Sequence, residues 1–172
     1  VRIHSQGYTP LCVSLDHLAP NHAEENASEA LVRGIAERFT QTGRKVGGFD
    51  AVTASDVPKG SGLSSSAAFS ILVSTIFSEL YNDGQISPVE QALASKYAEN
   101  RHFGKPSGLM DQLACAVGGF VMIDFEQPEE PKIEKIECDL SALGYGICIV
   151  NCGGNHADLT HEYAAVTKDM RE

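Results

Sequence analysis

The chain has 172 residues, 42% of them hydrophobic and 21% charged, which is enough to bury a core and excludes a disordered or fibrous protein. Its formal net charge of −10, with no cluster of lysines and arginines, argues against binding to nucleic acid or to an acidic membrane surface. No stretch is long enough to span a membrane, the five cysteines lack metal-site spacing, and the first residue is Val1. We therefore expect reduced thiols, a cytoplasmic location, and a chain that is a piece of a longer protein.

The first third of the chain predicts strands and one helix. Short apolar runs interrupted by Gly7 and Pro10 favour strand and turn within residues 1–18. From Asn26 to Phe39, apolar residues recur at helical spacing, with Asn26 as the expected cap and Gly43 beyond the end.

The middle third predicts a strand, a loop and two helices. Residues 49–54 form an apolar strand pattern that leads through a glycine-rich loop into a long apolar stretch at 67–81. Ser87 and Glu90 have the spacing of a capping box, which starts a helix expected to run to about Arg101.

Elements of both types continue to the end. The expected elements are a short helix at 109–117, strands at 120–125, 133–138 and 145–150, and a helix at 158–171, with the acidic residues 126–131 as a solvated turn. Strands and helices alternate irregularly, which favours an α+β fold over a doubly wound parallel sheet. With no linker or repeat, residues 1–172 are expected to form a single unit.

The loop before the long helix has the composition of an anion site. Gly60 and Gly62 allow a close backbone approach, and the helix start supplies unpaired N–H groups and a positive dipole end. The pattern is neither a Walker A loop nor a dinucleotide fingerprint, and a serine-rich helix cap after a tight turn is the alternative. The candidate phosphate-binding residues are Pro58, Gly60, Ser61, Gly62, Leu63, Ser64, Ser65, Ser66 and Ala67.

Residues 58–68 read Pro-x-Gly-x-Gly-Leu-Ser-Ser-Ser-Ala-Ala and resemble the phosphate loop of the GHMP kinases. This family groups galactokinases with homoserine, mevalonate and phosphomevalonate kinases. The resemblance implies the family's N-terminal domain, an α+β fold of the ribosomal protein S5 domain 2-like type with helices packed on a mixed sheet. It also implies that ATP is the co-substrate.

A second segment narrows the resemblance. Gly108-Leu109-Met110-Asp111-Gln112 is similar to the Gly-(Ile/Leu)-Met-Asp-Gln motif of galactokinases. Asp111 could be only a first-turn residue stabilised by the helix dipole, but the same dipole favours the ionised carboxylate that accepts a proton from a hydroxyl.

The resemblance assigns further roles. It implies that Asp111 is catalytic, that Gly108 and Asp111 contact the sugar, and that Ser66 and Glu99 hold Mg²⁺. Tyr163 resembles a tyrosine near the sugar, although a tyrosine in such a helix also serves packing.

The implied reaction is transfer of the ATP γ-phosphoryl group to the anomeric hydroxyl of galactose by a monomeric enzyme. Three alternatives remain: a related kinase acting on arabinose, galacturonate or N-acetylgalactosamine, a non-catalytic galactose and ATP sensor, and a structural domain without nucleotide. The early sugar-binding motif of galactokinases, Gly-Arg-(Val/Ile)-Asn-(Leu/Ile)-Ile-Gly-Glu-His-x-Asp, finds no match, and neither does the glycine-rich motif of their C-terminal domain. We therefore expect this piece to be inactive by itself.

Overall fold

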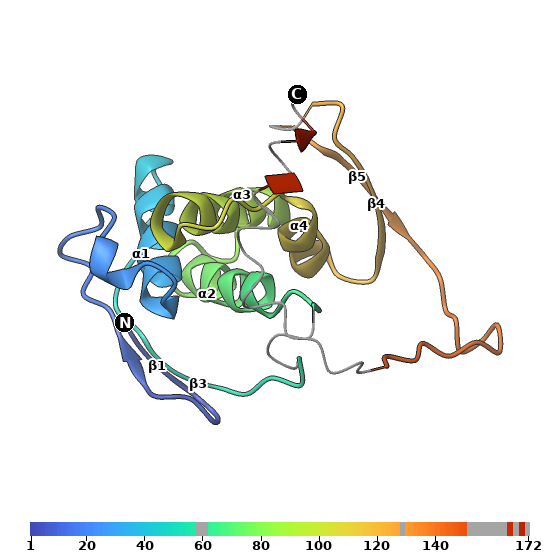
Figure 1. Cartoon of the computed structure of the whole chain (residues 1–172), viewed down its shortest axis with the longest axis horizontal. Coiled ribbons are helices and arrows are strands. Elements are labelled where there is room, and N and C mark those ends of the chain that lie inside the picture. Colours follow the sequence, from blue (N-terminus) through green and yellow to red (C-terminus); the bar gives the residue numbers. More distant parts are fainter. Residues whose placement is uncertain (58–61, 128–129, 151–164, 167–168, 171–172) are drawn as a thin grey trace.

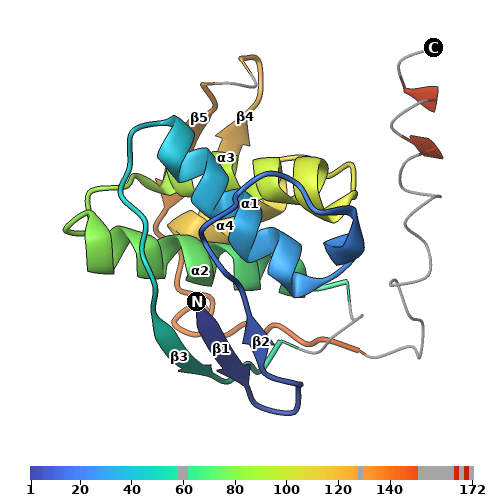
Figure 2. The same ribbon diagram turned by 90° about the vertical axis from the view of Figure 1, so that its left-hand side faces the viewer.

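The structure is a computed structural model that describes residues 1–57, 62–127, 130–150, 165–166 and 169–170. Its helices pack together, with one small sheet on either side of them (Figures 1 and 2). The elements are, in chain order, β1 (Arg2–Ser5), β2 (Leu11–Cys12), the 3-10 turn η1 (His22–Glu24), α1 (Ser28–Gln41), β3 (Asp50–Thr53), α2 (Ser65–Tyr81), α3 (Pro88–Ala98), the π-helical turn η2 (Glu99–Phe103), α4 (Met110–Val117), β4 (Phe120–Asp124) and β5 (Lys132–Ile136).

The first sheet is mixed. Its strand order is β2-β1-β3, in which β1 pairs antiparallel with β2 and parallel with β3. Because side chains alternate along a strand, Ile3 and Leu11 are buried while their neighbours Arg2 and Cys12 are exposed. The expected α+β class, with helices packed on a mixed sheet, is confirmed.

The helices meet the first sheet in the main hydrophobic core. Phe77 of α2 is fully buried, and its ring meets the rings of Phe39 and Phe49 edge to face, at centroid distances of 6.2 and 5.4 Å. Ile3 and Val32 belong to the same cluster, which joins β1 and α1 to α2. Burying several large apolar side chains together supplies most of the stabilisation of such a layer.

The expected cap of α1 at Asn26 is wrong. Asn26 has a left-handed backbone, with φ of 63°, and its N–H donates to the carbonyl of Phe103 at 3.1 Å. The helix begins at Ser28, and the capping position is taken by Ala27, which makes no side-chain capping bond. Gly43 lies beyond the helix end as expected, with φ of 77°.

Helix α3 begins as the sequence predicts and ends differently. Ser87 accepts a hydrogen bond from the N–H of Glu90, and the Glu90 side chain accepts one from the N–H of Ser87, which completes the capping box. The α-helix stops at Ala98, and the chain continues through the π-helical turn η2 to Phe103. The expected helix to Arg101 is therefore divided, and η2 carries Glu99, one of the predicted site residues.

Helices α1 and α3 approach closely at Gly34. A Cβ atom at this position would lie 2.7 Å from the Cα of Ala98 and 2.8 Å from the His102 ring. Only glycine fits there without displacing the end of α3 or the start of η2.

The second sheet is an antiparallel hairpin of β4 and β5. Ile123 and Ile133, which are directly opposite each other, pack against a buried cluster that includes Leu113 of α4. The hairpin thereby covers the helices on the side away from β1 (Figure 1).

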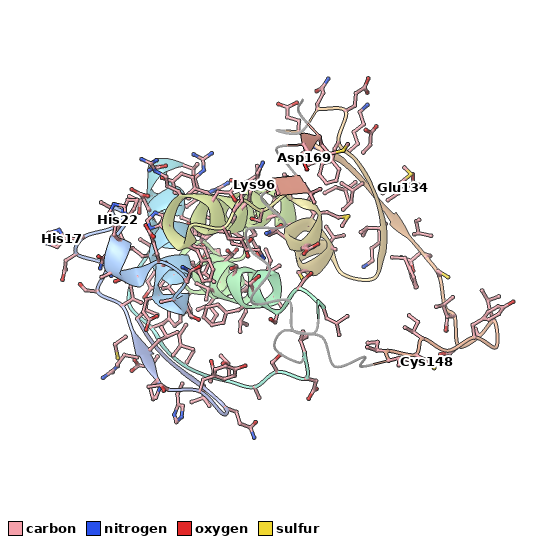
Figure 3. The ribbon with its side chains drawn as sticks, in the orientation of Figure 1. His17, His22, Lys96, Glu134, Cys148 and Asp169 are labelled. Carbon is pink, nitrogen blue, oxygen red and sulfur yellow. The ribbon has the colours of Figure 1, made fainter. Side chains whose placement is uncertain are left out.

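The strand expected at 145–150 is wrong. These residues form no strand, and Ile147 and Val150 are 72% and 82% exposed. Cys148 lies on an extended stretch apart from the helices (Figure 3), where no described strand pairs with it. The helix expected at 158–171 falls mostly outside the described residues; of the four described residues in this range, 165, 166 and 169 are helical and 170 is in a turn. Within the described part of the chain, no helix is long and apolar enough to cross a membrane.

Candidate active site

Three helix ends converge on a pocket of about 180 Å³. The first turn of α2 contributes Ser66 and Ala67, η2 contributes Glu99, and α4 with the loop before it contributes Gly108 and Asp111. The structure thus brings these five predicted site residues into one pocket, although up to 45 residues separate them in the sequence (66 to 111).

Asp111 is hydrogen-bonded to the serine-rich turn, which is the predicted phosphate loop at residues 58–67. The Ser64 hydroxyl donates to the Asp111 carboxylate at 2.6 Å. Asp111 lies in the first turn of α4 and is exposed to solvent at the pocket. Ser64 immediately precedes α2 and has a left-handed backbone, with φ of 59°, so that the chain turns sharply there.

The rest of the predicted phosphate loop is only partly described. Pro58, Gly60 and Ser61 lie outside the described residues, as does Tyr163. The remaining loop residues lie at the start of α2 or just before it but outside the pocket lining; they are Gly62, Leu63, Ser64 and Ser65.

Glu99 is the most buried ionisable group of the pocket, at 1% exposure. Its Oε2 accepts a hydrogen bond from Nε2 of Gln112 at 3.0 Å. Its Oε1 is buried and has no hydrogen-bond partner within the described structure. A buried carboxylate oxygen without a partner is costly, so the group is suited to a cation that completes it.

The loop between η2 and α4 is tied to the π-helical turn. Gly104 adopts a left-handed backbone, with φ of 84°, and the N–H of Lys105 donates to the carbonyl of Glu99 at 3.0 Å. The N–H of Ser107 donates to the Asn100 side chain at 2.7 Å. These bonds hold Lys105 at the pocket, next to the carboxylates.

Four pocket residues have no role in the sequence prediction, namely Ser107, Met110, Lys105 and Gln112, and the last two bear on the chemistry of the site. Both lie inside the segment that carries the Met-Asp-Gln motif. Lys105 lies between Glu99 and Asp111 in the sequence. A lysine between two acidic motif residues of a strongly acidic chain is the signal that could have identified it. Gln112 is polar and yet 2% exposed, a property that only the tertiary structure reveals.

The electrostatics of the pocket suit an anion and a cation together. The N-termini of α2 and α4 present N–H groups that have no acceptor within their own helix, together with positive dipole ends, and both attract phosphate oxygens. Within the described residues, no cluster of three or more His, Cys, Asp and Glu side chains is present to enclose a metal ion. A cation held by Glu99 would therefore take its other ligands from the Ser66 hydroxyl, water and a phosphate, which is the ligand set that Mg²⁺ accepts.

Cys115 lies one turn after Asp111 on α4. Neighbouring atoms remove water from the thiol even though the residue is exposed overall, and this desolvation, followed by the charge on Asp111, raises the pKa of Cys115. The thiol therefore stays protonated at neutral pH and is a poor nucleophile.

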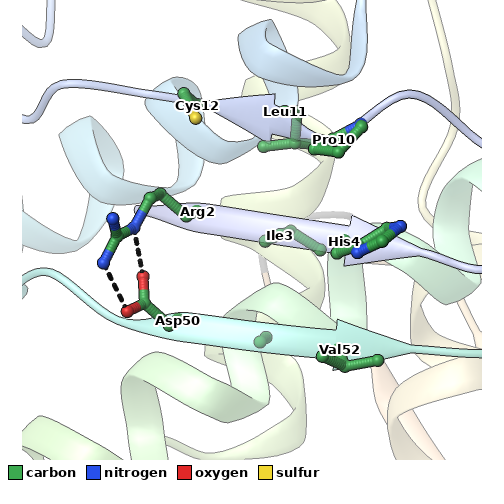
Figure 4. A pocket seen from close by; sticks show the side chains of 9 residues that line it. Arg2, Ile3, His4, Pro10, Leu11, Cys12, Asp50 and Val52 are labelled. Atoms are coloured by element: carbon green, nitrogen blue, oxygen red, sulfur yellow. Dashed lines mark hydrogen bonds and ion pairs between the residues drawn. The ribbon is translucent and has the colours of Figure 1, made fainter.

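A larger hollow, of about 300 Å³, lies on the first sheet near the exposed side chains of β1, β2 and β3 (Figure 4). Its charged groups are already paired, because Arg2 donates two hydrogen bonds of 2.6 Å to Asp50. The ion pair lowers the pKa of Asp50 through the hydrogen bond from Arg2. None of the buried, unpartnered side-chain atoms of the described residues lies in this hollow, so the smaller pocket is the better candidate.

Comparisons with known proteins place the chain in a family. Residues 30–119 match the GHMP kinases N terminal domain. This range includes the described part of the serine-rich turn, η2 and α4.

Two curated relatives that match this chain are both galactokinases, which are one group within that family. A galactokinase of Clostridium tetani is 35% identical over 109 residues, which is 63% of this chain and 28% of that protein. A galactokinase of Pyrococcus furiosus is 38% identical over 98 residues, which is 57% of this chain and 28% of that protein. The matched part of the chain thus spans less than a third of each relative.

Among solved structures, the galactokinase of Lactococcus lactis in complex with galactose has a similar fold. The TM-score is 0.62 at 20% identity, and the similarity covers 79% of this chain and 36% of that protein.

Proposed function

The chain belongs to the GHMP kinase family, and we propose on that premise that it forms most of the N-terminal, ATP-binding part of a galactokinase. The reaction is transfer of the γ-phosphoryl group of ATP to the anomeric hydroxyl of galactose, which gives galactose 1-phosphate and ADP. The observation that carries the proposal is the hydrogen bond from Ser64 to Asp111, because it brings the anion-binding turn next to the carboxylate that would face the sugar.

The helix ends perform the binding step. The N–H groups at the start of α2, with the hydroxyls of Ser65 and Ser66, bind the phosphate oxygens of ATP. Pro58, Gly60 and Ser61 complete this loop in the proposal. The fixed donors are set before the substrate arrives, so little reorganisation is needed as charge moves along the phosphates.

Glu99 and Ser66 supply the cation ligands. Oε1 of Glu99, which has no hydrogen-bond partner among the described residues, and the Ser66 hydroxyl line one pocket, and both are oxygen ligands of the kind that Mg²⁺ prefers. When bound, Mg²⁺ neutralises charge on the β- and γ-phosphates.

Asp111 orients the sugar hydroxyl and accepts its proton. It is exposed at the pocket, in the first turn of α4, where the positive end of the helix dipole attracts negative charge. Gly108 precedes α4, and a Cβ atom there would meet nothing within 4 Å, so this side of the pocket leaves space for a sugar ring. Tyr163 is proposed as a further sugar contact.

The experiment is a coupled ADP-release assay on the complete gene product with galactose, arabinose, galacturonate, N-acetylgalactosamine and glucose. We expect turnover with galactose, and a loss of at least about 10²-fold in kcat for Asp111→Asn with ATP affinity unchanged. Preference for another sugar of the panel would reassign the substrate within the family. Binding of galactose and ATP without ADP release would identify a sensor, and absence of ATP binding would remove the proposal.

A further inference from the structure

Gln112 is the one residue of the Met-Asp-Gln motif that is both buried and without a role in the reaction proposed above. Its side chain is 2% exposed and lies between the first turn of α4 and the π-helical turn η2. Its Nε2 donates to Oε2 of Glu99 at 3.0 Å. A buried polar side chain of this size needs a reason to be there, because burying an amide without full hydrogen bonding is unfavourable.

The hydrogen bond fixes how both side chains are turned. The amide nitrogen of Gln112, and not its oxygen, faces Glu99, and it donates to Oε2 of the carboxyl group. This leaves Oε1 of Glu99 and Oε1 of Gln112 as buried acceptors without a hydrogen-bond partner in the described structure. Both residues line the pocket that also contains Ser66.

We propose that Gln112 is a positioning residue for the divalent cation. It binds one oxygen of the Glu99 carboxylate and thereby keeps Oε1, the other oxygen, available to Mg²⁺. The inference rests on the proposed function, in which Glu99 and Ser66 are the cation ligands. Side chains that hold a ligating carboxylate in this way commonly change metal affinity by about 10- to 100-fold when they are replaced.

The first turn of α4 carries one carboxylate of the site, Asp111, and contacts the other, Glu99. Successive residues of an α-helix point about 100° apart. Asp111 is therefore directed to Ser64 at the pocket surface, while Gln112 is directed inward to Glu99. The first turn of α4 thus sets the orientation of its own carboxylate and of the carboxylate on η2.

The test measures metal binding and not turnover. The complete gene product is titrated with Mn²⁺ in the presence of ADP, and free Mn²⁺ is followed by electron paramagnetic resonance. For Gln112→Leu, which has a similar volume but no donor, we expect Mn²⁺ affinity to fall about tenfold or more, while ADP affinity without metal stays within twofold. Gln112→Asn, which is polar but too short to reach Glu99, should show the same loss and provides a second variant if the leucine variant does not fold.

Two controls separate positioning from packing. Ser95→Ala removes a buried hydroxyl that bonds to Ser74 and Gln91, outside the pocket, and should leave Mn²⁺ affinity unchanged. In a Glu99→Gln background, Gln112→Leu should cause no further loss of affinity, because its effect passes through the Glu99 carboxylate.

The possible results distinguish failure of the positioning role from failure of the proposed function. Mn²⁺ affinity within twofold of the wild type for Gln112→Leu would overturn the positioning role and leave the kinase proposal standing. Additive losses in the double variant would also overturn it. A wild-type protein that binds no Mn²⁺ with ADP would overturn both the positioning role and the proposed function.

Discussion

Ser64 and Asp111, which are 47 residues apart in the sequence, are joined by a hydrogen bond of 2.6 Å. One residue precedes the longest helix, and the other lies in the first turn of the shortest α-helix. The contact thus connects the two segments that the sequence analysis identified separately.

Removing the Ser64 hydroxyl should reduce catalysis more than nucleotide binding. A hydrogen bond to a charged group contributes about 1.5–3 kcal/mol, so kcat/KM for galactose should fall about tenfold or more in Ser64→Ala. Because Ser64 has a left-handed backbone, Ser64→Gly tests the hydroxyl without adding backbone strain and should show the same loss. Ser65→Ala is the matched control, with an effect on KM for ATP only. Unchanged kcat/KM in both Ser64 variants would contradict the role.

Lys105 should contribute to nucleotide affinity. It lines the pocket beside Glu99 and Asp111, and within the described structure it makes no ion pair with either. Lys105→Met should weaken ATP binding about tenfold, as expected for loss of one charged contact to phosphate, whereas Lys105→Arg should retain most of it. Isothermal titration calorimetry measures the affinities. Lys96→Met removes the same charge from α3 outside the pocket (Figure 3) and should have no effect.

Gly34→Ala should destabilise the fold and the cation site together. The added methyl group would overlap Ala98 and His102, which flank Glu99. Overpacking of this kind costs about 1–3 kcal/mol, and we expect the melting temperature to fall by about 5 °C and Mn²⁺ affinity to fall with it. Gly48→Ala, where the methyl group would meet nothing within 4 Å, should change neither. Equal melting temperatures for the two variants would show that α1 and α3 can separate without cost.

The ion pair of Glu24 and Arg33 should make stability depend on pH. Arg33 donates to both oxygens of Glu24, at 2.8 and 2.7 Å, and also bonds to the carbonyls of Ser14 and His17. The hydrogen bond from Arg33 lowers the pKa of Glu24 below its ordinary value. A carboxylate with a lowered folded-state pKa stabilises the fold above its unfolded-state pKa, and this contribution is lost as the pH falls through the folded-state pKa.

Glu24→Gln should therefore lower the melting temperature at pH 7 by about 5 °C, corresponding to ~2 kcal/mol for a partly buried pair, and the difference should disappear in acid. Thermal unfolding of both proteins between pH 7 and pH 3 measures it. Glu25→Gln is the control, since its partner His22 is exposed and the pair should contribute little. A difference that persists unchanged at pH 3 would assign the loss to packing.

Local signals predicted the elements well. The capping box of Ser87 and Glu90 depends on residues three positions apart, and the structure contains it as predicted. Asn26 has an equally good local signal but is not a cap, because its N–H is bonded to Phe103, 77 residues later by sequence number. The apolar residues 145–150 lack a described strand to pair with, so their pattern alone did not produce a strand.

The chemistry of the pocket was only partly accessible from the sequence. Ser66, Glu99 and Asp111 were identified through motifs, and the pocket contains all three. The hydrogen bonds that orient these residues were not identified, because Gln112 meets Glu99, and Ser64 meets Asp111, only after α2, η2 and α4 have packed together. Neither contact follows from helical or strand periodicity.

Because η2 is a π-helical turn, the number of residues between Glu99 and Phe103 is as important as their identity. A π-helical turn places one more residue in a turn than the α-helix before it, so every side chain that follows is rotated relative to α3. Deleting a single residue between Glu99 and Phe103 would restore α-helical winding and turn the loop that carries Lys105 and Gly108 away from the pocket. Natural variants of this segment are therefore expected to tolerate exchanges of exposed residues such as Arg101 far better than insertions or deletions.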